Sequence, residues 1–329
     1  MRPNAQGVDA PNQVATLRER ARLTDHLRQW FREQNYWEVE TPLLSRDCCI
    51  DAWLEPFSLV LDDGTPVYLQ TSPEFLMKRL LCLGAERIFQ ITRSFRKDEV
   101  GAWHNPEFTI VEWYAIEETH LGQMDFVEGL VNSLRVCVGM EPLPPFVRLT
   151  YQQAFRDVLE VCPFEITTSD LRRLVLDRTT SRPSTTPEDR DDLLNLLLAE
   201  CVEPRIAAQG AVFLMDYPAS QSALARIRRD GGFAVAERFE LYLDGIEICN
   251  GYHELTDAEE LRFRMDSQNR KRLASGKPSL PVESQLLQLM EVSPFPPSAG
   301  VALGWDRLIA WLLGRDGIRD VLTFPFDQV

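Results

Sequence analysis

The sequence has no apolar run long enough to cross a bilayer and no recognisable signal peptide, so we expect a cytoplasmic protein that does not enter a membrane. Its seven cysteines form no CxxC pair and are odd in number, which indicates neither a zinc site nor a disulfide framework. Basic residues are few, because 35 Lys and Arg stand against 50 Asp and Glu, for a net charge of −15. Nucleic-acid binding normally requires a broad basic surface, so this balance argues against a nucleic-acid partner.

The chain is long enough for one large domain and little else. It has 329 residues, of which 44% are hydrophobic, and it shows no internal repeat or low-complexity tail. We expect a disordered tail over residues 1–13 and a single domain over residues 14–329. Proline-rich stretches at residues 141–145 and 181–187 indicate a helical insertion in this domain, at about residues 141–210.

The most informative stretch covers residues 94–114, SFRKDEVGAWHNPEFTIVEWY, which combines cations, amides and carboxylates. Arg96 follows an apolar run that is typical of a strand, and a guanidinium group there can bind phosphate oxygens in a bidentate manner. A loop with His104 and Asn105 comes next, and the alternation over residues 108–114 predicts a second strand. On composition alone, the pattern is that of an ordinary hairpin with a charged tip.

The order of residues in this stretch resembles motif 2 of the class II aminoacyl-tRNA synthetases, in the form used by the lysyl branch. The resemblance implies that Arg96 holds the α-phosphate of ATP and that the loop folds over the adenine. It assigns ATP contacts to Arg96, Lys97, Asp98, His104 and Asn105, and it places Glu112 and Tyr114 in the amino-acid pocket. The family pattern is Arg-any-Glu, so the shorter Asp98 departs from it.

A second signature, Gly300-Val-Ala-Leu-Gly-Trp-Asp-Arg307, precedes an apolar helix and resembles motif 3 of the same family. Glycines on a strand allow a ligand to approach the backbone, and Arg307 at the start of the helix can place a second cation on the triphosphate. On its own, the pattern describes a glycine-kinked strand before a core helix. The resemblance implies ATP contacts by Gly304 and Arg307, but the sequence gives no interpretation of Trp305.

The segment that resembles motif 1 is a helix through Leu17, Leu23, Leu27 and Phe31, followed by a strand over residues 37–44. As bare sequence it is only a helix before a strand. In the family this element builds the dimer interface, so the resemblance implies a homodimer.

Asp244-Gly245 between two apolar runs is a strong signal for a two-residue hairpin turn. A regular hairpin places Glu240 opposite Cys249 and puts Glu240 and Glu247 on one face, about 7 Å apart at the backbone. Two carboxylates so close repel each other, so a shared divalent cation is the natural counter-charge, although surface acid pairs are often merely solvated. The resemblance implies that Glu240 and Glu247 bind the magnesium of ATP, and that Glu247 and Ile248 contact the nucleotide.

Three carboxylates, Glu74, Glu112 and Glu254, match positions of the family's amino-acid pocket. A cluster of acids in a pocket suits a polycationic ligand, and a diamino acid fits. By itself, however, residues 72–74 form a helix-capping signal. The resemblance assigns substrate contacts to Ser72, Pro73, Glu74, Glu112, Tyr114, Asn250, Glu254 and Ala302.

Almost end to end, the chain resembles truncated lysyl-tRNA synthetase paralogues that attach (R)-β-lysine to elongation factor P. The motifs span residues 36–314, which leaves no room for an N-terminal anticodon-binding barrel, while residues 222–224 and Ala302 match the paralogues rather than the synthetases. This resemblance implies an α+β class II catalytic fold, with a mostly antiparallel sheet flanked by helices. It also implies a ligase that uses ATP and magnesium to form a β-lysyl adenylate and transfers β-lysine to a lysine of elongation factor P, without tRNA.

Three other functions remain open at this stage. A small tRNA synthetase without an anticodon domain is one, and an ammonia-dependent asparagine synthetase shares both fold and length, although the lysyl-type loop argues against it. A catalytically silent paralogue that acts as a regulatory module is the third. Such a protein is expected to lose Arg96, Arg307 or the acid pair, and all of these are present.

Overall fold

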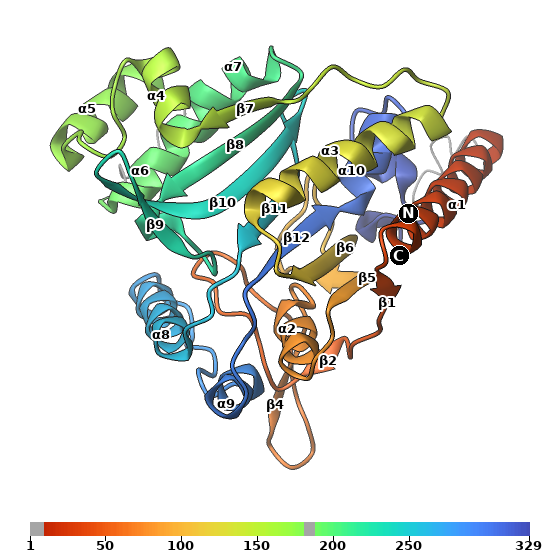
Figure 1. The fold of residues 1–329 in the computed structure, drawn as a ribbon, viewed down its shortest axis with the longest axis horizontal. Helices are drawn as coiled ribbons and strands as arrows, with labels where there is room; N and C mark the ends of the chain where they lie inside the picture. Colours follow the sequence, from red (N-terminus) through yellow and green to blue (C-terminus); the bar gives the residue numbers. More distant parts are fainter. Residues whose placement is uncertain (1–9, 181–187) are drawn as a thin grey trace, which may run out of the picture.

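The computed structural model describes residues 10–180 and 188–329. A nine-stranded sheet forms its centre, with the order β1-β5-β6-β12-β11-β10-β8-β7 and β9 paired to β10 (Figure 1). The pairings are antiparallel except at the two edges, where β1 is parallel to β5 and β7 is parallel to β8. The strands are β1 (Trp37–Glu38), β5 (Arg87–Phe95), β6 (Glu107–Ile116), β7 (Val147–Thr150), β8 (Ala211–Pro218), β9 (Ile227–Asp230), β10 (Phe233–Leu243), β11 (Ile246–His253) and β12 (Ser298–Gly304). The predicted α+β class is confirmed.

The strand-loop-strand predicted around Arg96 is present as β5 and β6, which pair antiparallel with Gln90 opposite Glu112. Side chains alternate along β6, as on any strand. Val111 and Trp113 enter the main hydrophobic core, whereas Glu112 lines a cavity on the other face. One strand therefore serves both the core and a polar site.

Three helices cover the core face of the sheet: α1 (Ala10–Glu33), α3 (His120–Cys137) and α10 (Trp305–Leu312) (Figure 1). Leu23, Leu27 and Phe31 of α1 are spaced by four residues, so they form one stripe that is completely buried. Burying such side chains contributes about 1.5–3 kcal/mol each. Trp305 belongs to this core, and its indole N–H donates to Thr24 Oγ1 at 3.1 Å. Its role is therefore to pack α10 against α1.

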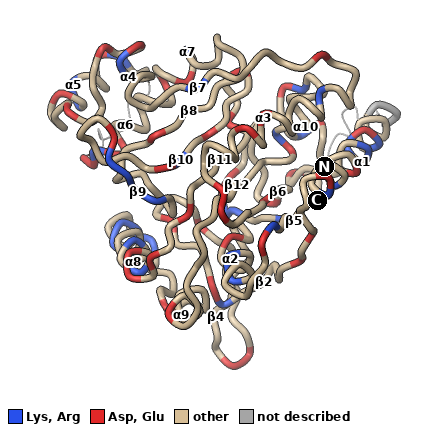
Figure 2. Tube along the Cα trace, viewed as in Figure 1, with Lys and Arg blue, Asp and Glu red and all other residues tan. Residues whose placement is uncertain are grey.

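Beyond the opposite face lie α2 (Glu74–Cys82), α8 (Ala258–Ala274), α9 (Gln285–Val292) and a small sheet of β2 (Leu44–Ser45), β3 (Ser58–Val60) and β4 (Pro66–Leu69). Polar side chains cap the N-termini of α8 and α9, because Asp257 accepts from the Glu260 N–H and Ser284 accepts from the Leu287 N–H. Figure 2 shows Lys and Arg gathered along α8. Several of them contact acids, as in Arg264–Glu260, Lys271–Asp191 and Arg272–Glu55.

A further group of helices follows β7 and gathers beside β8, with a hydrophobic core of its own (Figure 1). It consists of α4 (Tyr151–Leu159), α5 (Thr168–Arg178), α6 (Arg190–Leu197), a π-helical turn (Leu198–Val202) and α7 (Glu203–Ala207). Three short 3-10 helices, Ala219–Gln221, Ile318–Val321 and Phe326–Gln328, complete the secondary structure of the described residues. The second proline-rich stretch, residues 181–187, lies outside them. So do residues 1–9 of the expected tail, whereas α1 already begins at Ala10.

The hairpin at Asp244-Gly245 forms, but its predicted register is wrong beyond Glu247. Glu240 pairs with Asn250 rather than with Cys249, because a β-bulge inserts Ile248 as an extra residue in β11. Since Tyr242 still pairs with Glu247, the bulge keeps Glu240 and Glu247 on the same face of the sheet. The consequence is that Asn250, and not Cys249, shares the face of the two acids.

No helix in the described part of the chain is both long and apolar enough to span a membrane. All seven cysteines are described, and each is a free thiol.

Candidate active site

Two adjoining cavities open on the face of the sheet opposite α3. The smaller has a volume of about 170 Å³ and the larger about 750 Å³. Arg96, Ile110, Asn250 and Ala302 line both, so the two cavities adjoin at these residues. Of the predicted ATP residues, the smaller cavity holds Arg96, His104, Asn105, Glu247, Ile248, Gly304 and Arg307. Of the predicted substrate residues, the larger holds Ser72, Glu74, Glu112, Tyr114, Asn250, Glu254 and Ala302.

Arg307 is fixed at the smaller cavity by three residues from two segments, a loop and β11. Its NH1 donates to the Glu247 backbone oxygen at 2.9 Å and lies 3.3 Å from Glu247 Oε2. Its Nε donates to the Trp103 carbonyl, and its NH2 lies 2.7 Å from His104 Nε2. Burial, followed by the charge of Arg307, lowers the pKa of His104, so this imidazole is neutral and accepts the hydrogen bond. The cation is therefore held in place before any anion binds.

Arg96 is the second cation of this cavity. Its guanidinium lies 5.0 Å from the centre of the Phe108 ring, and its NH1 is 3.8 Å from Glu99. Its buried Nε has no hydrogen-bond partner among the described residues. A guanidinium with a free donor at a cavity that already holds Arg307 is suited to a polyanion.

Four predicted residues do not line either cavity in the described structure. They are Lys97, Asp98, Pro73 and Glu240. Asp98 has a left-handed backbone with φ of 66°, and it is the next residue, Glu99, that lines the smaller cavity beside Arg96. Sequence reasoning missed Glu99, because the family spacing pointed to residue 98. Asn105 lies at the cavity, but its side chain donates to the Glu107 carbonyl and accepts from the Phe326 N–H.

Glu240 and Glu247 differ in how their charges are compensated. Glu240 is buried, pairs with Arg238 and accepts hydrogen bonds from the hydroxyls of Tyr217 and Tyr242, both at 2.6 Å. Burial opposes its ionisation, but Arg238 and these donors outweigh it and lower the pKa of Glu240. For Glu247, burial and repulsion from Glu240 raise the pKa. Arg238 therefore compensates the charge of Glu240, whereas Glu247 depends on Arg307 and is repelled by Glu240 when it ionises.

The three predicted acids of the larger cavity converge, and they bring a cation that the sequence analysis did not identify. Lys78 Nζ lies 2.7 Å from Glu74 Oε1 and 2.6 Å from Glu254 Oε2. Glu112 instead accepts from the hydroxyls of Tyr114 at 2.6 Å and Ser72 at 2.7 Å. The available signal was the spacing of four between Glu74 and Lys78 on a helix, which puts them on one face.

Burial controls the protonation of these acids. It raises the pKa of Glu112 to about 8, with repulsion from Glu74 as the second cause. Burial also raises the pKa of Glu254, although Lys78 opposes that shift. Carboxyls that hold protons near neutral pH give them up when a cation arrives, so this cavity is suited to a ligand with ammonium groups.

Ala302 lies where the two cavities meet, because it pairs with Glu112 on one side and with Asn250 on the other. Gly300, two residues earlier, tolerates no side chain. A Cβ there would come within 2.3 Å of the Tyr114 ring and 2.7 Å of Glu254 Oε1. The glycine therefore lets the acids approach the strand, while the methyl group of Ala302 limits the space between the two cavities.

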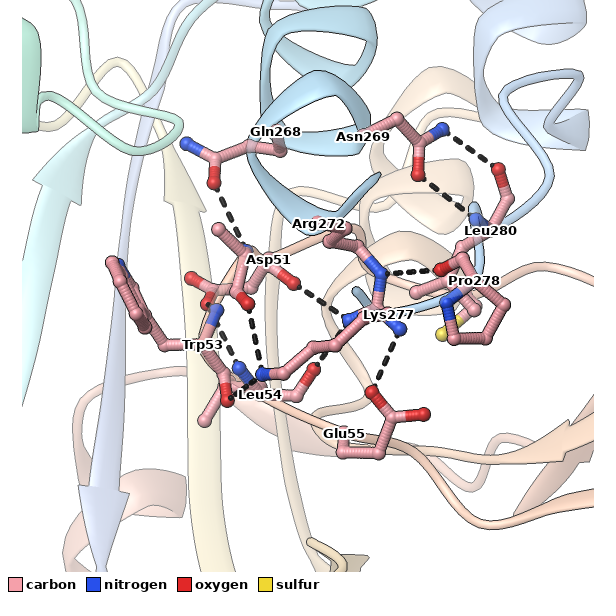
Figure 3. A network of polar contacts seen from close by, with 12 residues as sticks. Asp51, Trp53, Leu54, Glu55, Gln268, Asn269, Arg272, Lys277, Pro278 and Leu280 are labelled. Atoms are coloured by element: carbon pink, nitrogen blue, oxygen red, sulfur yellow. Dashed lines mark hydrogen bonds and ion pairs between the residues drawn. The ribbon is translucent and has the colours of Figure 1, made fainter. Parts of the chain in front are cut away.

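The outer wall of the larger cavity is a loop over residues 50–54 that α8 holds in place (Figure 3). Arg272 is completely buried and donates to the carbonyls of Asp51 and Leu54 and to the Glu55 carboxylate. Lys277 Nζ donates to the carbonyls of residues 52 and 53. These charged donors satisfy backbone oxygens that have no partner strand, which fixes a loop that lacks secondary structure.

Comparison with known proteins agrees with this geometry. The family of tRNA synthetases class II (D, K and N) matches residues 6–328. Among curated proteins, the chain is 40% identical over 320 residues to the elongation factor P--(R)-beta-lysine ligase of Enterobacter sp. (strain 638), which covers 96% of both chains. The ligases of the same name from Salmonella gallinarum and Vibrio atlanticus are each 41% identical over 320 residues, covering 96% of this chain and 96% and 97% of theirs. The chain therefore belongs to the class II tRNA synthetase family of the aspartyl, lysyl and asparaginyl type.

Proposed function

We propose that this chain is an ATP-dependent, AMP-forming ligase that activates (R)-β-lysine as an adenylate and transfers it to a lysine side chain of elongation factor P. The relatives that match it over 96% of their length carry that name. The observation that supports it most directly is that the two cavities share four lining residues. A site with two arginines for phosphates runs, past Ala302, into a site with three carboxylates for ammonium groups.

In the first step, a carboxylate oxygen of β-lysine attacks the α-phosphorus of ATP, and the bond to pyrophosphate breaks. Negative charge builds on the phosphate oxygens during this step. Arg96 and Arg307 line the cavity where the phosphates bind, so they stabilise that charge. The acids of the larger cavity hold the ammonium groups, which keeps the substrate carboxylate directed toward the nucleotide.

Magnesium is part of this proposal, because the residues fit it. Glu247 lines the cavity, and repulsion from Glu240 helps to raise its pKa, so a cation bound between the two acids would relieve that repulsion. Glu240 does not line the cavity, but its carboxylate receives three donors, from Arg238, Tyr217 and Tyr242, and has about four acceptor positions, so one remains for an ion held mainly by Glu247. Bound there, the ion would neutralise phosphate charge. Glu247→Gln is expected to raise the magnesium concentration needed for half-maximal adenylate formation, while β-lysine binding changes little.

In the second step, the neutral amine of the acceptor lysine attacks the carbonyl carbon of the adenylate. The bond to AMP breaks, an amide forms and the amine loses one proton. No covalent intermediate with the enzyme is needed, so positioning and electrostatic stabilisation account for the catalysis.

We further infer the partner of this protein, its oligomeric state and the compartment in which it acts. The partner is elongation factor P and not tRNA, and the reaction takes place in the cytoplasm. We infer a homodimer through motif 1, formed by α1 and the strand after it. The large apolar side chains of Trp37 and Leu44 are exposed in the single chain beside this element, which supports an interface there.

Mass spectrometry of purified elongation factor P tests the function. Incubation with the enzyme, ATP and (R)-β-lysine is expected to add one β-lysyl group to one lysine, and omission of ATP serves as the control. An Arg307→Ala enzyme provides a matched catalytic control. Failure to modify the factor, together with aminoacylation of tRNA, would contradict the proposal and support a tRNA synthetase without an anticodon domain.

A further inference from the structure

A second cluster of polar side chains lies on the core face of the sheet, behind the large cavity. It consists of His120 at the start of α3, Glu237 on β10 and His253 on β11, and each offers one ligand atom within 4.8 Å of the others. Arg238 pairs with Tyr252, so Glu237 and His253 are neighbours across the two strands. The N-terminus of α3 brings His120 to the same place, from a distant part of the sequence.

His120 is the central observation. Its side chain is buried, at 4% exposure, and neither ring nitrogen has a hydrogen-bond partner among the described residues. A buried polar group without a partner normally costs about 1–3 kcal/mol. The imidazole does not cap its own helix, because Thr119 accepts from the Gly122 N–H. Both nitrogen atoms are therefore available to a ligand.

Unlike His120, Glu237 and His253 contact each other and two arginines. His253 Nδ1 lies 2.6 Å from Glu237 Oε2, but within residues 10–180 and 188–329 this oxygen accepts no hydrogen bond. Two cations approach from the outer side. Arg226 NH1 lies 3.2 Å from His253 Nε2, and Arg228 Nε lies 3.7 Å from Glu237 Oε1. Arg226 is half-exposed, so it can turn into solvent and release Nε2 of His253.

We propose that His120, Glu237 and His253 form a binding site for a divalent transition metal of the zinc type. Two imidazoles and one carboxylate are a known ligand set for zinc, with water in the fourth position, and nitrogen donors disfavour magnesium and calcium. The metal ties the start of α3 to β10 and β11. Residue 254, directly after His253, is an acid of the larger cavity, so this metal supports the substrate site from behind.

Zinc titration of the full-length protein tests the site. The protein is first freed of metal with a chelator and kept in excess magnesium without ATP, so that Glu240 and Glu247 do not contribute. Competition with a chromophoric zinc chelator is expected to show one equivalent bound. His120→Leu should weaken that binding by at least about 10-fold. His26→Gln changes a histidine of α1 that contacts Ser133, so it should retain the full equivalent.

Thermal unfolding distinguishes a metal-binding role of His120 from a purely structural one. His120→Leu removes no hydrogen bond, so the metal-free variant should melt at or above the parent temperature, but zinc should stabilise only the parent. Arg226→Ala removes a competing cation and should tighten zinc binding about 3-fold or more. Equal zinc affinity in the parent and His120→Leu would overturn the proposal. Unchanged or weaker affinity in Arg226→Ala would also overturn it, whether or not His120→Leu folds.

Discussion

The ammonium group of Lys78 lies 2.6 Å from Glu254 Oε2, and both side chains are almost completely buried. Lys78 also contacts Glu74, so it neutralises part of a cluster that contains three carboxylates, those of Glu74, Glu112 and Glu254. One cation against three potential anions leaves two negative charges when all are ionised. A diamino acid brings two ammonium groups, so the charge of the fully ionised pocket matches the class of ligand that we propose for it.

Replacing Lys78 by Met should therefore destabilise the empty protein. Loss of one partner leaves buried carboxylates uncompensated, which typically costs about 3–5 kcal/mol. The free energy of unfolding from urea denaturation measures this. Lys271→Met is the matched control, because Lys271 is partly exposed and 3.6 Å from Asp191, and it should cost less than about 1 kcal/mol. Equal losses in the two variants would contradict a special role for the buried pair.

Adenylate formation should depend strongly on both arginines of the smaller cavity. Replacing Arg96 or Arg307 by Ala is expected to reduce it by about 10² to 10³, because a preorganised cation is removed from developing phosphate charge. ATP–pyrophosphate exchange measures the rate, and circular dichroism checks that the fold survives. Near-normal exchange in either variant would show that the replaced arginine does not stabilise the phosphate charge.

Ligand binding should be coupled to proton release through Glu112. Its pKa is raised to about 8, above the ordinary value of 4.5, so the empty pocket holds this proton at pH 7. A cationic ligand favours the ionised form, and affinity should therefore rise as the pH increases from about 6 to 8. Calorimetry in two buffers of different ionisation enthalpy counts the protons released, and Glu112→Gln should release fewer.

The raised pKa of Glu112 also predicts how the free energy of unfolding changes with pH. Between pH 4.5 and about 8 the folded protein binds more protons at Glu112 than the unfolded chain does, so this group makes the protein less stable as the pH rises through that window. The free energy of unfolding should fall less steeply with pH in Glu112→Gln than in the parent. Identical slopes and identical proton release in the two proteins would refute the assignment.

Sequence reasoning succeeded where function depends on spacing along one strand or one helix. The motifs predict strand alternation and helix starts, and in the structure Arg96 and Arg307 line the smaller cavity while Glu112 and Glu254 line the larger. It failed where a local irregularity intervenes. The bulge at Ile248 shifts the hairpin register by one residue, and the turn residues give no indication of this shift.

Other features depended on contacts between distant segments. Lys78 on α2 contacts Glu254, which follows β11 far along the sequence, and the indole of Trp305 donates to Thr24 of α1. Asp98 takes a left-handed conformation, and the next residue, Glu99, lines the cavity in its place. These contacts and conformations are determined by tertiary packing, which overrides the local conformational preference of the sequence.

The choice between α- and β-lysine should depend on Ala302. Moving the amino group to the β-carbon changes its position relative to the carboxylate, while the distal ammonium still reaches the acids. The methyl group of Ala302 stands between Glu112 and Asn250, where the two cavities join. In a close-packed site one methyl group discriminates by about 1–3 kcal/mol.

Ala302→Gly is therefore expected to improve activation of α-lysine relative to β-lysine by about 10-fold or more, at a stability cost of about 1 kcal/mol or less. The ratio of kcat/KM for the two lysines in both proteins measures it. Trp305 is buried against α1, so it offers no alternative, whereas Cys249 lines the smaller cavity. An unchanged ratio would move the origin of selectivity to the Cys249 side and would weaken the case for a β-lysine ligase over a lysyl-tRNA synthetase.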